Sequence, residues 1–285
     1  MERSDFLRSL IDLDGTGLEI GPSYNPLVPK SAGYRIETAD YTDACELRAK
    51  YQDARNVDIS RIEEVDHVVK KKSLAQTVGK RNHYDYIVAS HVIEHTPDML
   101  RFLKDCELML KPAGILLLAV PDKRCCFDVF QPLTSTGGVL QAHFDRHTKP
   151  ALGTIFDDRA YNAIRAGAIG WPIASDGALS FFLELPTALS TFAADRKRKS
   201  YIDVHVWKFV PSSFRLIVND LYALGEMRLR ENQFFDSVGN EFYVTLSGTG
   251  AGCSETRLNL ARRTLAEHAQ ILLESSWQAG GGGGS

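Results

Sequence analysis

The chain has 285 residues, of which 44% are hydrophobic and 24% are charged, and its formal net charge is −3. These values are ordinary for a globular protein, and the length allows one large domain or one domain with an inserted cap. The nearly balanced charge gives no electrostatic case for a nucleic-acid partner or a membrane surface. No apolar run approaches the roughly 18 residues that a membrane span needs, so we expect no span.

The cysteines give no sign of a metal site. None of the five forms a C-x-x-C pair, and the adjacent Cys125 and Cys126 lack the spacing of a zinc pair. We therefore expect no metal. An odd cysteine count without a signal peptide favours a reduced, cytoplasmic setting. Residues 279–285 form a Gly/Ser stretch that we expect to be a flexible tail.

The first informative segment is a strand over 17–20 that runs into a turn at Gly21. Glycine lets the backbone approach a ligand closely, and Glu19 is costly to bury unless it has a partner, which a ligand would supply. A second strand over 34–39 leads to Asp40, nineteen residues beyond Gly21. That spacing suits an acid that grips a ribose, although the full G-x-G-x-x-G is absent and an ordinary strand-to-loop turn remains an alternative.

The next elements alternate between helices and strands. We expect a helix over 44–51, a short third strand over 62–66 that ends in Asp66, and a fourth strand over 84–90. Pro97 and Asp98 open a helix whose apolar residues recur at helical spacing, and an apolar strand follows over 115–120. This alternation predicts an α/β fold with helices on both faces of a parallel sheet.

Regularity is lost after the fifth strand, so we expect an inserted cap over 122–205 that binds the acceptor. Order resumes with a helix near 214–224, two strands over 227–235 and 241–246 joined by a hairpin-like turn, and a final helix near 255–275. The core domain is then expected to comprise residues 1–121 and 206–278.

Four segments carry a resemblance to a known family. They are the strand end Leu18-Glu19-Ile20-Gly21-Pro22, the acid Asp40, the run from Tyr84 to His95 with its Glu-His pair, and the turn Leu110-Lys111-Pro112-Ala113-Gly114 into the fifth strand. Together they resemble class I S-adenosylmethionine-dependent methyltransferases. The resemblance implies a Rossmann-like, seven-stranded, mostly parallel sheet with an antiparallel C-terminal hairpin strand, and S-adenosyl-L-methionine as cofactor. Ser23 replaces the second glycine of the usual G-x-G.

Residues Pro22 to Lys30 and Val120 to Arg124 resemble a subgroup associated with surface-polysaccharide and glycosyltransferase systems. This implies O-methylation of a sugar or glycan and a link to glycosyltransferase partners or fused domains. Alternatives are a methyltransferase for a non-glycan small molecule and a cofactor-binding module without turnover. An NAD-type oxidoreductase is disfavoured because the nicotinamide fingerprint is missing.

The resemblance also implies the cofactor-binding residues. They are Glu19, Gly21, Pro22, Ser23, Asp40, Asp66, Ser90 and His91. Glu19 and Gly21 would face the amino-acid part of the cofactor. Asp40 would accept both ribose hydroxyls, and Asp66 would accept the adenine amino group.

Histidines are the candidates for a general base, because imidazole titrates in the useful range. The sequence offers His91, His95, His143, His147 and His205. We favour His205 with Asp203, since residues two apart on an extended segment face the same way and the acid could orient the ring. His95 could line the cofactor pocket. A structural histidine packed beside Trp207 is the alternative for His205.

Overall fold

A computed structural model describes residues 1–54 and 56–274. In chain order the helices and strands are α1 (Arg3–Arg8), β1 (Gly17–Ile20), β2 (Ile36–Asp40), α2 (Ala44–Tyr51), β3 (His67–Val68), α3 (Leu74–Val78), β4 (Tyr84–Ser90), α4 (Met99–Met109), β5 (Leu110–Pro121), α5 (Thr136–Phe144), α6 (Leu152–Tyr161), β6 (Ala163–Arg165), β7 (Leu179–Phe181), α7 (Leu185–Asp195), α8 (Pro211–Ala223), β8 (Arg230–Val238), β9 (Glu241–Ser247) and α9 (Arg257–Glu274). The short 3₁₀ turns are η1 (Lys30–Ala32), η2 (Ile59–Arg61), η3 (Ile93–His95) and η4 (Lys123–Cys125).

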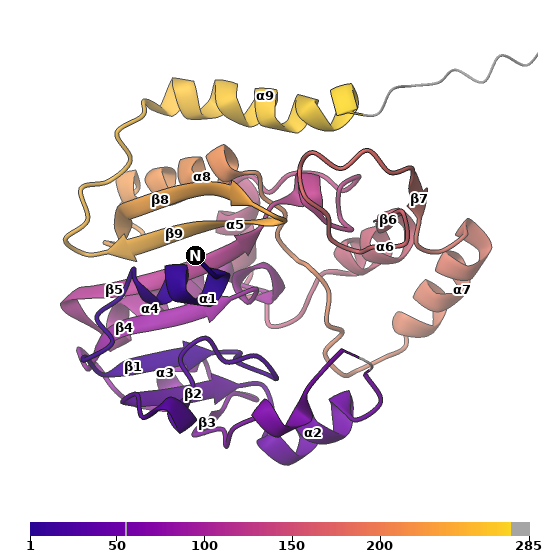
Figure 1. Cartoon of the computed structure of the whole chain (residues 1–285). Coiled ribbons are helices and arrows are strands. Elements are labelled where there is room, and N and C mark those ends of the chain that lie inside the picture. The colour runs from indigo at the N-terminus through magenta and orange to yellow at the C-terminus, as the bar shows by residue number, and fades with distance from the viewer. Residues whose placement is uncertain (55, 275–285) are drawn as a thin grey trace, which may run out of the picture.

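The centre of the molecule is a seven-stranded sheet with the strand order β3-β2-β1-β4-β5-β9-β8 (Figure 1). Strands β1 to β5 pair in parallel, whereas β9 runs antiparallel to both β5 and β8. The predicted Rossmann-like sheet with its antiparallel hairpin strand is therefore confirmed. The strand order reverses between β1 and β4, and ligands of such sheets bind at the carboxyl ends of the strands beside that point.

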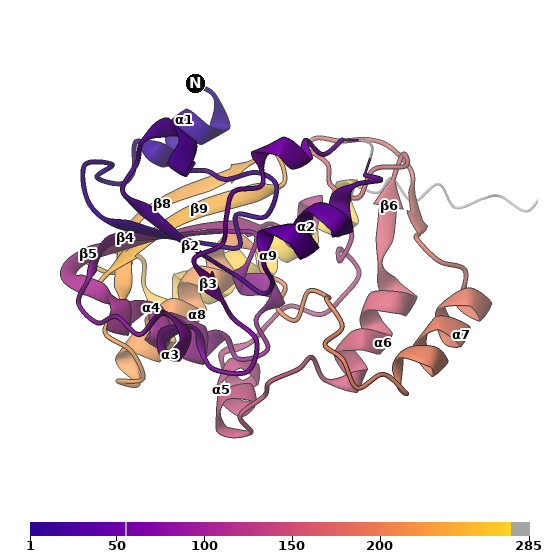
Figure 2. The same ribbon diagram turned by 90° about the horizontal axis from the view of Figure 1, so that it is seen from below.

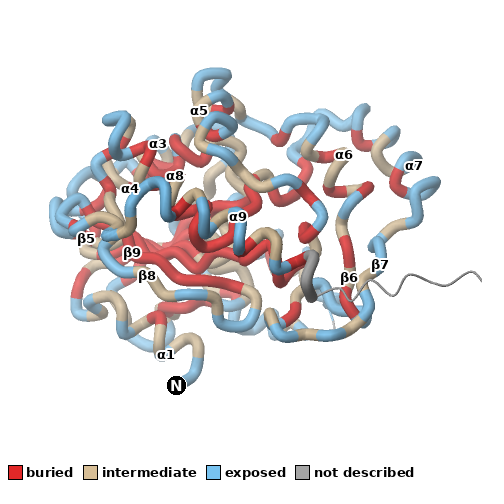
Figure 3. Tube along the Cα trace, turned by 90° about the horizontal axis from the view of Figure 1, so that it is seen from above, coloured by how far each residue is buried: buried red, intermediate tan, exposed pale blue. Residues whose placement is uncertain are grey.

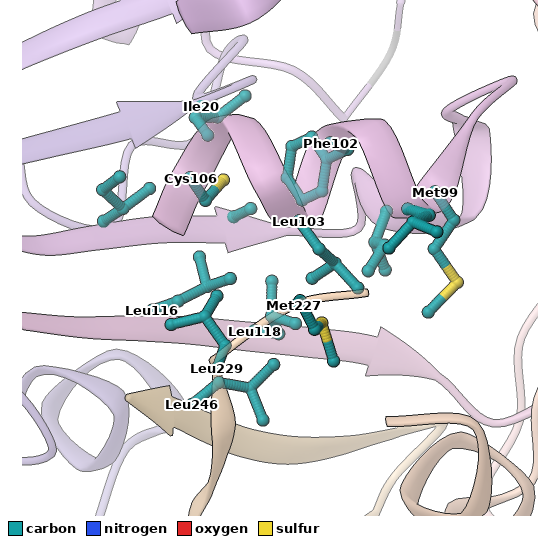
Figure 4. Packing of buried hydrophobic residues seen from close by; sticks show 14 of the residues in the cluster. Ile20, Met99, Phe102, Leu103, Cys106, Leu116, Leu118, Met227, Leu229 and Leu246 are labelled. Atoms are coloured by element: carbon teal, nitrogen blue, oxygen red, sulfur yellow. The ribbon is translucent and has the colours of Figure 1, made fainter. Parts of the chain in front are cut away.

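Alternating side chains of the central strands build two hydrophobic layers. Ile87 and Leu116 belong to the larger layer, which also contains apolar residues of α3, α4, α5 and α8. Figure 4 shows how Phe102 and Leu103 of α4 pack against the strands. Tyr86 and Leu117 point to the opposite face, where α1 and the loop after β1 cover them. The central strands of the sheet are thus buried, as the red tube of β5 and β9 in Figure 3 shows, whereas the edge strand β8 is partly exposed.

The chain leaves the sheet after β5 and forms the region that was expected to be a cap. Its helix α5 packs against α4 and α8, while α6 and α7 pack against each other and β6 pairs with β7. Figure 2 shows α6 and α7 standing to one side of the sheet. The division into a core and an acceptor-binding cap remains a prediction.

Several expected elements differ from the structure. The third strand, β3, lies directly after the predicted range 62–66. Helices α1 and α3, and the helices and hairpin of the cap, were not predicted. A strand of two residues and helices of five or six leave too little periodicity to recognise. The boundary at residue 278, the tail 279–285 and the end of the last helix at 275 lie outside the described residues. No helix within the described ranges combines the length and apolarity needed to cross a membrane.

Candidate functional site

The turn after β1 has a conformation that requires glycine. Gly21 has φ +65°, and a Cβ atom there would lie 2.8 Å from Cγ2 of Val92. Its N–H donates to the carbonyl of Ala39 at 2.8 Å, which fixes the turn beside the end of β2. A side chain at this position would be strained and would collide with the loop after β4. The glycine therefore brings three strand ends together at the point where the strand order reverses.

Glu19 obtains its partners from the protein itself. The side chain is buried, and its two carboxylate oxygens accept hydrogen bonds from the N–H groups of Leu27 and Val28 at 2.7 and 2.9 Å. Burial disfavours the charged form and raises the pKa of Glu19 to about 7, although the two N–H groups oppose this shift. The expectation that a ligand supplies the partner is thus replaced by a structural role, since this carboxyl group holds the loop that follows the glycine turn.

Asp40 and Ser23 form the part of this edge that suits a hydroxyl-bearing ligand. Asp40 ends β2, and its carboxylate accepts from the N–H of Tyr41 at 2.7 Å and from the N–H of Ser23 at 3.3 Å. Burial raises the pKa of Asp40. The hydroxyl of Ser23 is buried and has no hydrogen-bond partner among the described residues. A buried hydroxyl without a partner, beside a carboxylate, fits the ribose of S-adenosylmethionine. Pro22 lies between Gly21 and Ser23 in the same turn.

Asp66 does not lie where an adenine-binding acid was expected. It precedes β3 instead of ending it, so it is at the amino end of the strand. Its carboxylate accepts from Lys30 Nζ at 2.5 Å and from the N–H of Thr38 at 2.7 Å. Partial burial opposes ionisation, but these two donors outweigh it and lower the pKa of Asp66. The carboxylate therefore ties β2 and β3 to η1, and the position gives the proposed adenine contact no support.

Ser90 and His91 connect β4 to the antiparallel strand β9. The Ser90 hydroxyl accepts from Arg3 Nη2 at 2.7 Å, and His91 Nε2 lies 2.7 Å from Oε2 of Glu241. Burial opposes ionisation of Glu241, but Arg3 and His91 outweigh it and lower its pKa to about 2. His91 has φ +54°, in the left-handed region that residues other than glycine rarely adopt. Both predicted residues thus lie at the carboxyl end of β4, with polar partners from this chain.

The loop after β4 carries a buried acid, Glu94, in η3. The segment 201–207 docks on this turn, because the N–H groups of Val206 and Trp207 donate to the Glu94 carbonyl at 2.6 and 3.1 Å. The Tyr201 hydroxyl donates to the carbonyl of His95 at 2.6 Å. The returning chain is therefore held against the strand ends, and this contact brings His205 next to Glu94 and His95.

The two histidines are oriented by different acids. His95 Nδ1 lies 2.8 Å from Oδ1 of Asp203, and His205 Nδ1 is hydrogen-bonded to Oδ2 of Asp128 at 2.8 Å. The ring centroids are 4.8 Å apart and nearly perpendicular. The predicted Asp203–His205 pair is therefore wrong. Residues 201–208 form no strand, so the exposed Asp203 and the buried His205 do not share a face.

The pKa values of His95, Asp203 and Asp128 are shifted by these contacts. Burial opposes protonation of His95, but Asp203 and Glu94 outweigh it and raise its pKa. The pKa of Asp203 is lowered by its contact with His95. Burial opposes ionisation of Asp128, but the His205 ring outweighs it and lowers the pKa of that acid. Each ring thus has an acid beside its Nδ1, an arrangement that orients the ring and leaves Nε2 directed toward Glu94.

The histidines line a pocket of about 220 Å³ between the strand ends and the cap. It mixes apolar and hydrogen-bonding side chains, and the lining residues are His95, Phe127, Asp158, Asn162, Ile169, Phe182, Asp203, Val204 and His205. Sequence reasoning missed Asp128 and Asp158, which lie in a region without recognisable pattern. Glu94 was within the quoted Glu-His pair but was given no role.

The remaining candidate histidines have other surroundings. His143 Nδ1 lies 3.0 Å from Oδ2 of Asp98, and His147 Nε2 lies 3.8 Å from Oδ2 of Asp145. Neither residue lines the pocket. They are less suitable as bases for a substrate bound there.

Comparison with known proteins agrees with this fold. A family described as "Methyltransferase domain" matches residues 3–166. A highly reducing polyketide synthase, rstn3, from Aspergillus nomiae is 28% identical over 160 residues, which are 54% of this chain and 6% of the synthase. The chain therefore spans only a small part of that relative's length.

The solved structures that the chain matches have low sequence identity and TM-scores below 0.5. A SAM-dependent methyltransferase from Aquifex aeolicus is 12% identical with a TM-score of 0.41, covering 86% of this chain and 88% of its own. A SAM-dependent methyltransferase from Thermotoga maritima is 20% identical with a TM-score of 0.30, covering 42% and 51%.

The family is established by the domain match, which covers more than half of the chain and includes the glycine turn, Asp40 and the loop after β4. The strand order and the antiparallel β9 are those of the expected fold. The turn and the acid beside it also fit the cofactor. The chain belongs to the methyltransferase domain family, and its sheet has the topology that the resemblance to class I S-adenosylmethionine-dependent methyltransferases predicts.

Proposed function

We propose that this methyltransferase transfers a methyl group to a hydroxyl oxygen of a small, polyhydroxylated acceptor of the sugar class. The observation that carries the proposal is the pocket beside Glu94, in which two acid-oriented histidines meet aromatic and carboxylate side chains. S-adenosylmethionine, when bound, supplies an electrophilic methyl group on a sulfonium. The residues of this chain then have to position the acceptor and remove its proton.

The lining of the pocket favours a sugar over a purely apolar acceptor. Phe127 and Phe182 offer ring surfaces, while Asp158, Asn162 and Asp203 offer hydrogen-bonding groups. A sugar has apolar C–H faces and several hydroxyl groups, so it can use both kinds of contact. The volume of about 220 Å³ is below the roughly 300–1,000 Å³ of drug-sized sites, which favours a single small ring at the reacting end.

The cofactor is assigned to the opposite side of the strand ends. Asp40 would accept the ribose hydroxyls, and the unpartnered Ser23 hydroxyl would bond to the same part of the cofactor. Gly21 fixes the turn beside them, because a Cβ atom there would collide with Val92. Ser90 and His91 lie at the end of β4 and would border the sulfur end, from which the methyl group faces the acceptor.

His205 is the residue assigned to activation of the hydroxyl. It is buried, it lines the pocket, and Asp128 holds its Nδ1, so its Nε2 is the nitrogen available to the site. His95 flanks the same space with Asp203 behind it. A correctly placed general base is typically worth about 10²–10⁴ in rate. The link to glycan-assembly partners and the cytoplasmic location rest on the sequence motifs and composition alone.

The test is transfer of a labelled methyl group from S-adenosylmethionine to a panel of acceptors. The panel contains free sugars, sugar nucleotides, catechols and amines of similar size. We expect methyl ethers to form on sugar-type acceptors, with less product from amines. Methylation of a non-sugar alcohol alone would show that the acceptor is a hydroxyl compound of another class. Cofactor binding without transfer to any acceptor would favour a binding module without turnover.

A further inference from the structure

Glu94 is a buried acid that lacks the partners such a group requires. The residue is 0% exposed, and neither carboxylate oxygen has a hydrogen-bond partner among the described residues. A buried carboxylate without a compensating partner is strongly unfavourable. Three histidine nitrogens surround this acid at 3.6–3.9 Å, too far for a direct hydrogen bond.

The two pocket histidines turn free nitrogens toward Glu94. His95 Nε2 is 3.8 Å and His205 Nε2 is 3.9 Å from Oε1 of that acid. A carboxylate only accepts, so the hydrogen bond from His205 to Asp128 places the proton on Nδ1 and leaves the lone pair of the neutral ring on Nε2. The charge of Asp203, 2.8 Å from Nδ1 of His95, favours the same tautomer there. The three ligand atoms lie within 4.8 Å of one another. Histidine ligands of metals are held by outer carboxylates in this same way.

We propose that Glu94, His95 and His205 bind a divalent transition-metal cation, such as Zn²⁺, Mn²⁺ or Fe²⁺. Two imidazoles and one carboxylate are a donor set for these ions, whereas Mg²⁺ and Ca²⁺ prefer oxygen ligands. The cation would give the two carboxylate oxygens of Glu94 the partner that they lack among the described residues. The cysteine spacing predicted no metal, whereas these ligands come from distant segments that only the fold brings together.

The site has a role in the reaction if the proposed function holds. Because His95 and His205 also line the acceptor pocket, a cation between them would lie beside an acceptor hydroxyl. A cation lowers the pKa of an oxygen bound to it. The O–H bond then breaks and its proton passes to solvent water. The oxygen lone pair forms the O–CH₃ bond as the C–S bond breaks, and that electron pair stays on sulfur in S-adenosylhomocysteine. With the cation bound, His205 serves the acceptor hydroxyl as a metal ligand, and the base role assigned to it in the proposed function applies to the metal-free protein.

The direct test measures binding of the metals alone. The full-length protein is treated with chelator and dialysed, and then titrated with Zn²⁺, Mn²⁺ and Mg²⁺ by calorimetry, and with Co²⁺ by visible absorption. We expect one ion per chain, with Zn²⁺ and Co²⁺ bound more tightly than Mg²⁺. Glu94→Gln and His205→Ala should lose binding by more than about 100-fold, which exceeds the 10–100-fold typical of an outer partner.

Matched variants distinguish a specific metal site from nonspecific metal binding. Asp128→Asn keeps every ligand but alters the group behind His205, so it should weaken binding by about 10–100-fold. His143→Ala removes a histidine outside the cluster and should bind like the wild type. Thermal unfolding of each metal-free variant checks folding, and added Zn²⁺ should raise the Tm of the wild type but not of Glu94→Gln. Absence of binding, or equal binding by folded Glu94→Gln, would overturn the site.

A separate experiment tests whether the cation takes part in methyl transfer. Methyl transfer should stop after chelation and return with one of the bound metals, while S-adenosylmethionine affinity stays almost unchanged. Full turnover by metal-free protein would overturn this role and return His205 to the part of a direct base. Failure of the proposed function looks different, because then no hydroxylated acceptor reacts although the titrations still detect the metal.

Discussion

The buried carboxyl group of Glu19 should make the stability of this protein depend on pH. Its folded-state pKa is about 7, raised from 4.5 chiefly by burial. The folded state therefore binds the proton more tightly than the unfolded chain does. Stability from this group is fully present below about pH 4.5 and is lost as the pH rises to about 7. At about 1.36 kcal/mol for each pH unit, the loss is about 3 kcal/mol.

Glu19→Gln isolates this effect because glutamine stays neutral. The amide oxygen can still accept from one of the two loop N–H groups, so the variant should lose about 0.5–1.5 kcal/mol at every pH from the missing bond. Its stability relative to the wild type should then rise by about 3 kcal/mol between pH 4.5 and pH 8.

The assay is urea unfolding of both proteins at several pH values from 4.5 to 8. The difference in the free energy of unfolding cancels contributions from other groups that titrate in both proteins. A difference that stays constant over the whole range would refute the reasoning. It would mean that the hydrogen bonds from Leu27 and Val28 fully offset burial and keep the carboxyl group ionised.

Three further predictions concern the cofactor and the acceptor. Asp40→Ala should weaken S-adenosylmethionine binding by about 1–3 kcal/mol in calorimetry, and unchanged affinity in a folded protein would remove the ribose assignment. Gly21→Ala should cost about 1–3 kcal/mol of stability from its left-handed backbone, with a further loss of cofactor affinity from the contact with Val92; a wild-type melting curve would contradict this. Phe182→Ala should raise the KM for the acceptor while leaving cofactor affinity intact, as measured by steady-state kinetics and calorimetry. An unchanged KM for the acceptor together with weaker cofactor binding would contradict this.

Much of the sheet could be predicted because its strands carry strong local signals. The apolar run 115–120 and the aromatic and β-branched run 84–90 both form central strands, β5 and β4. Strand β3 has only two residues, His67 and Val68, and its position depends on pairing with β2. A strand of two residues leaves no periodic signal in the sequence, so the predicted strand over 62–66 ended directly before β3 and gave Asp66 the wrong position.

The site was less accessible to sequence reasoning because it is assembled by tertiary contacts. Gly21 and Asp40 were recognised from local spacing, and the structure places both at the strand ends. The partner of His205 was not recognised. It is Asp128, from the irregular region after β5, and not the nearby Asp203. Spacing of two residues implies a shared face only in an extended strand, and that segment is fixed instead by its hydrogen bonds to η3.

The central claim is that the pocket beside Glu94 methylates a hydroxyl group of a sugar-type acceptor. The most direct measurement is single-turnover transfer from S-adenosylmethionine carrying a ¹³C-labelled methyl group, with the product identified by NMR. The account predicts a methyl ether from the wild-type protein and a rate about 10²–10⁴ lower for His205→Ala, with unchanged cofactor affinity. A methyl group on nitrogen or carbon, or the same rate in both proteins, would contradict it.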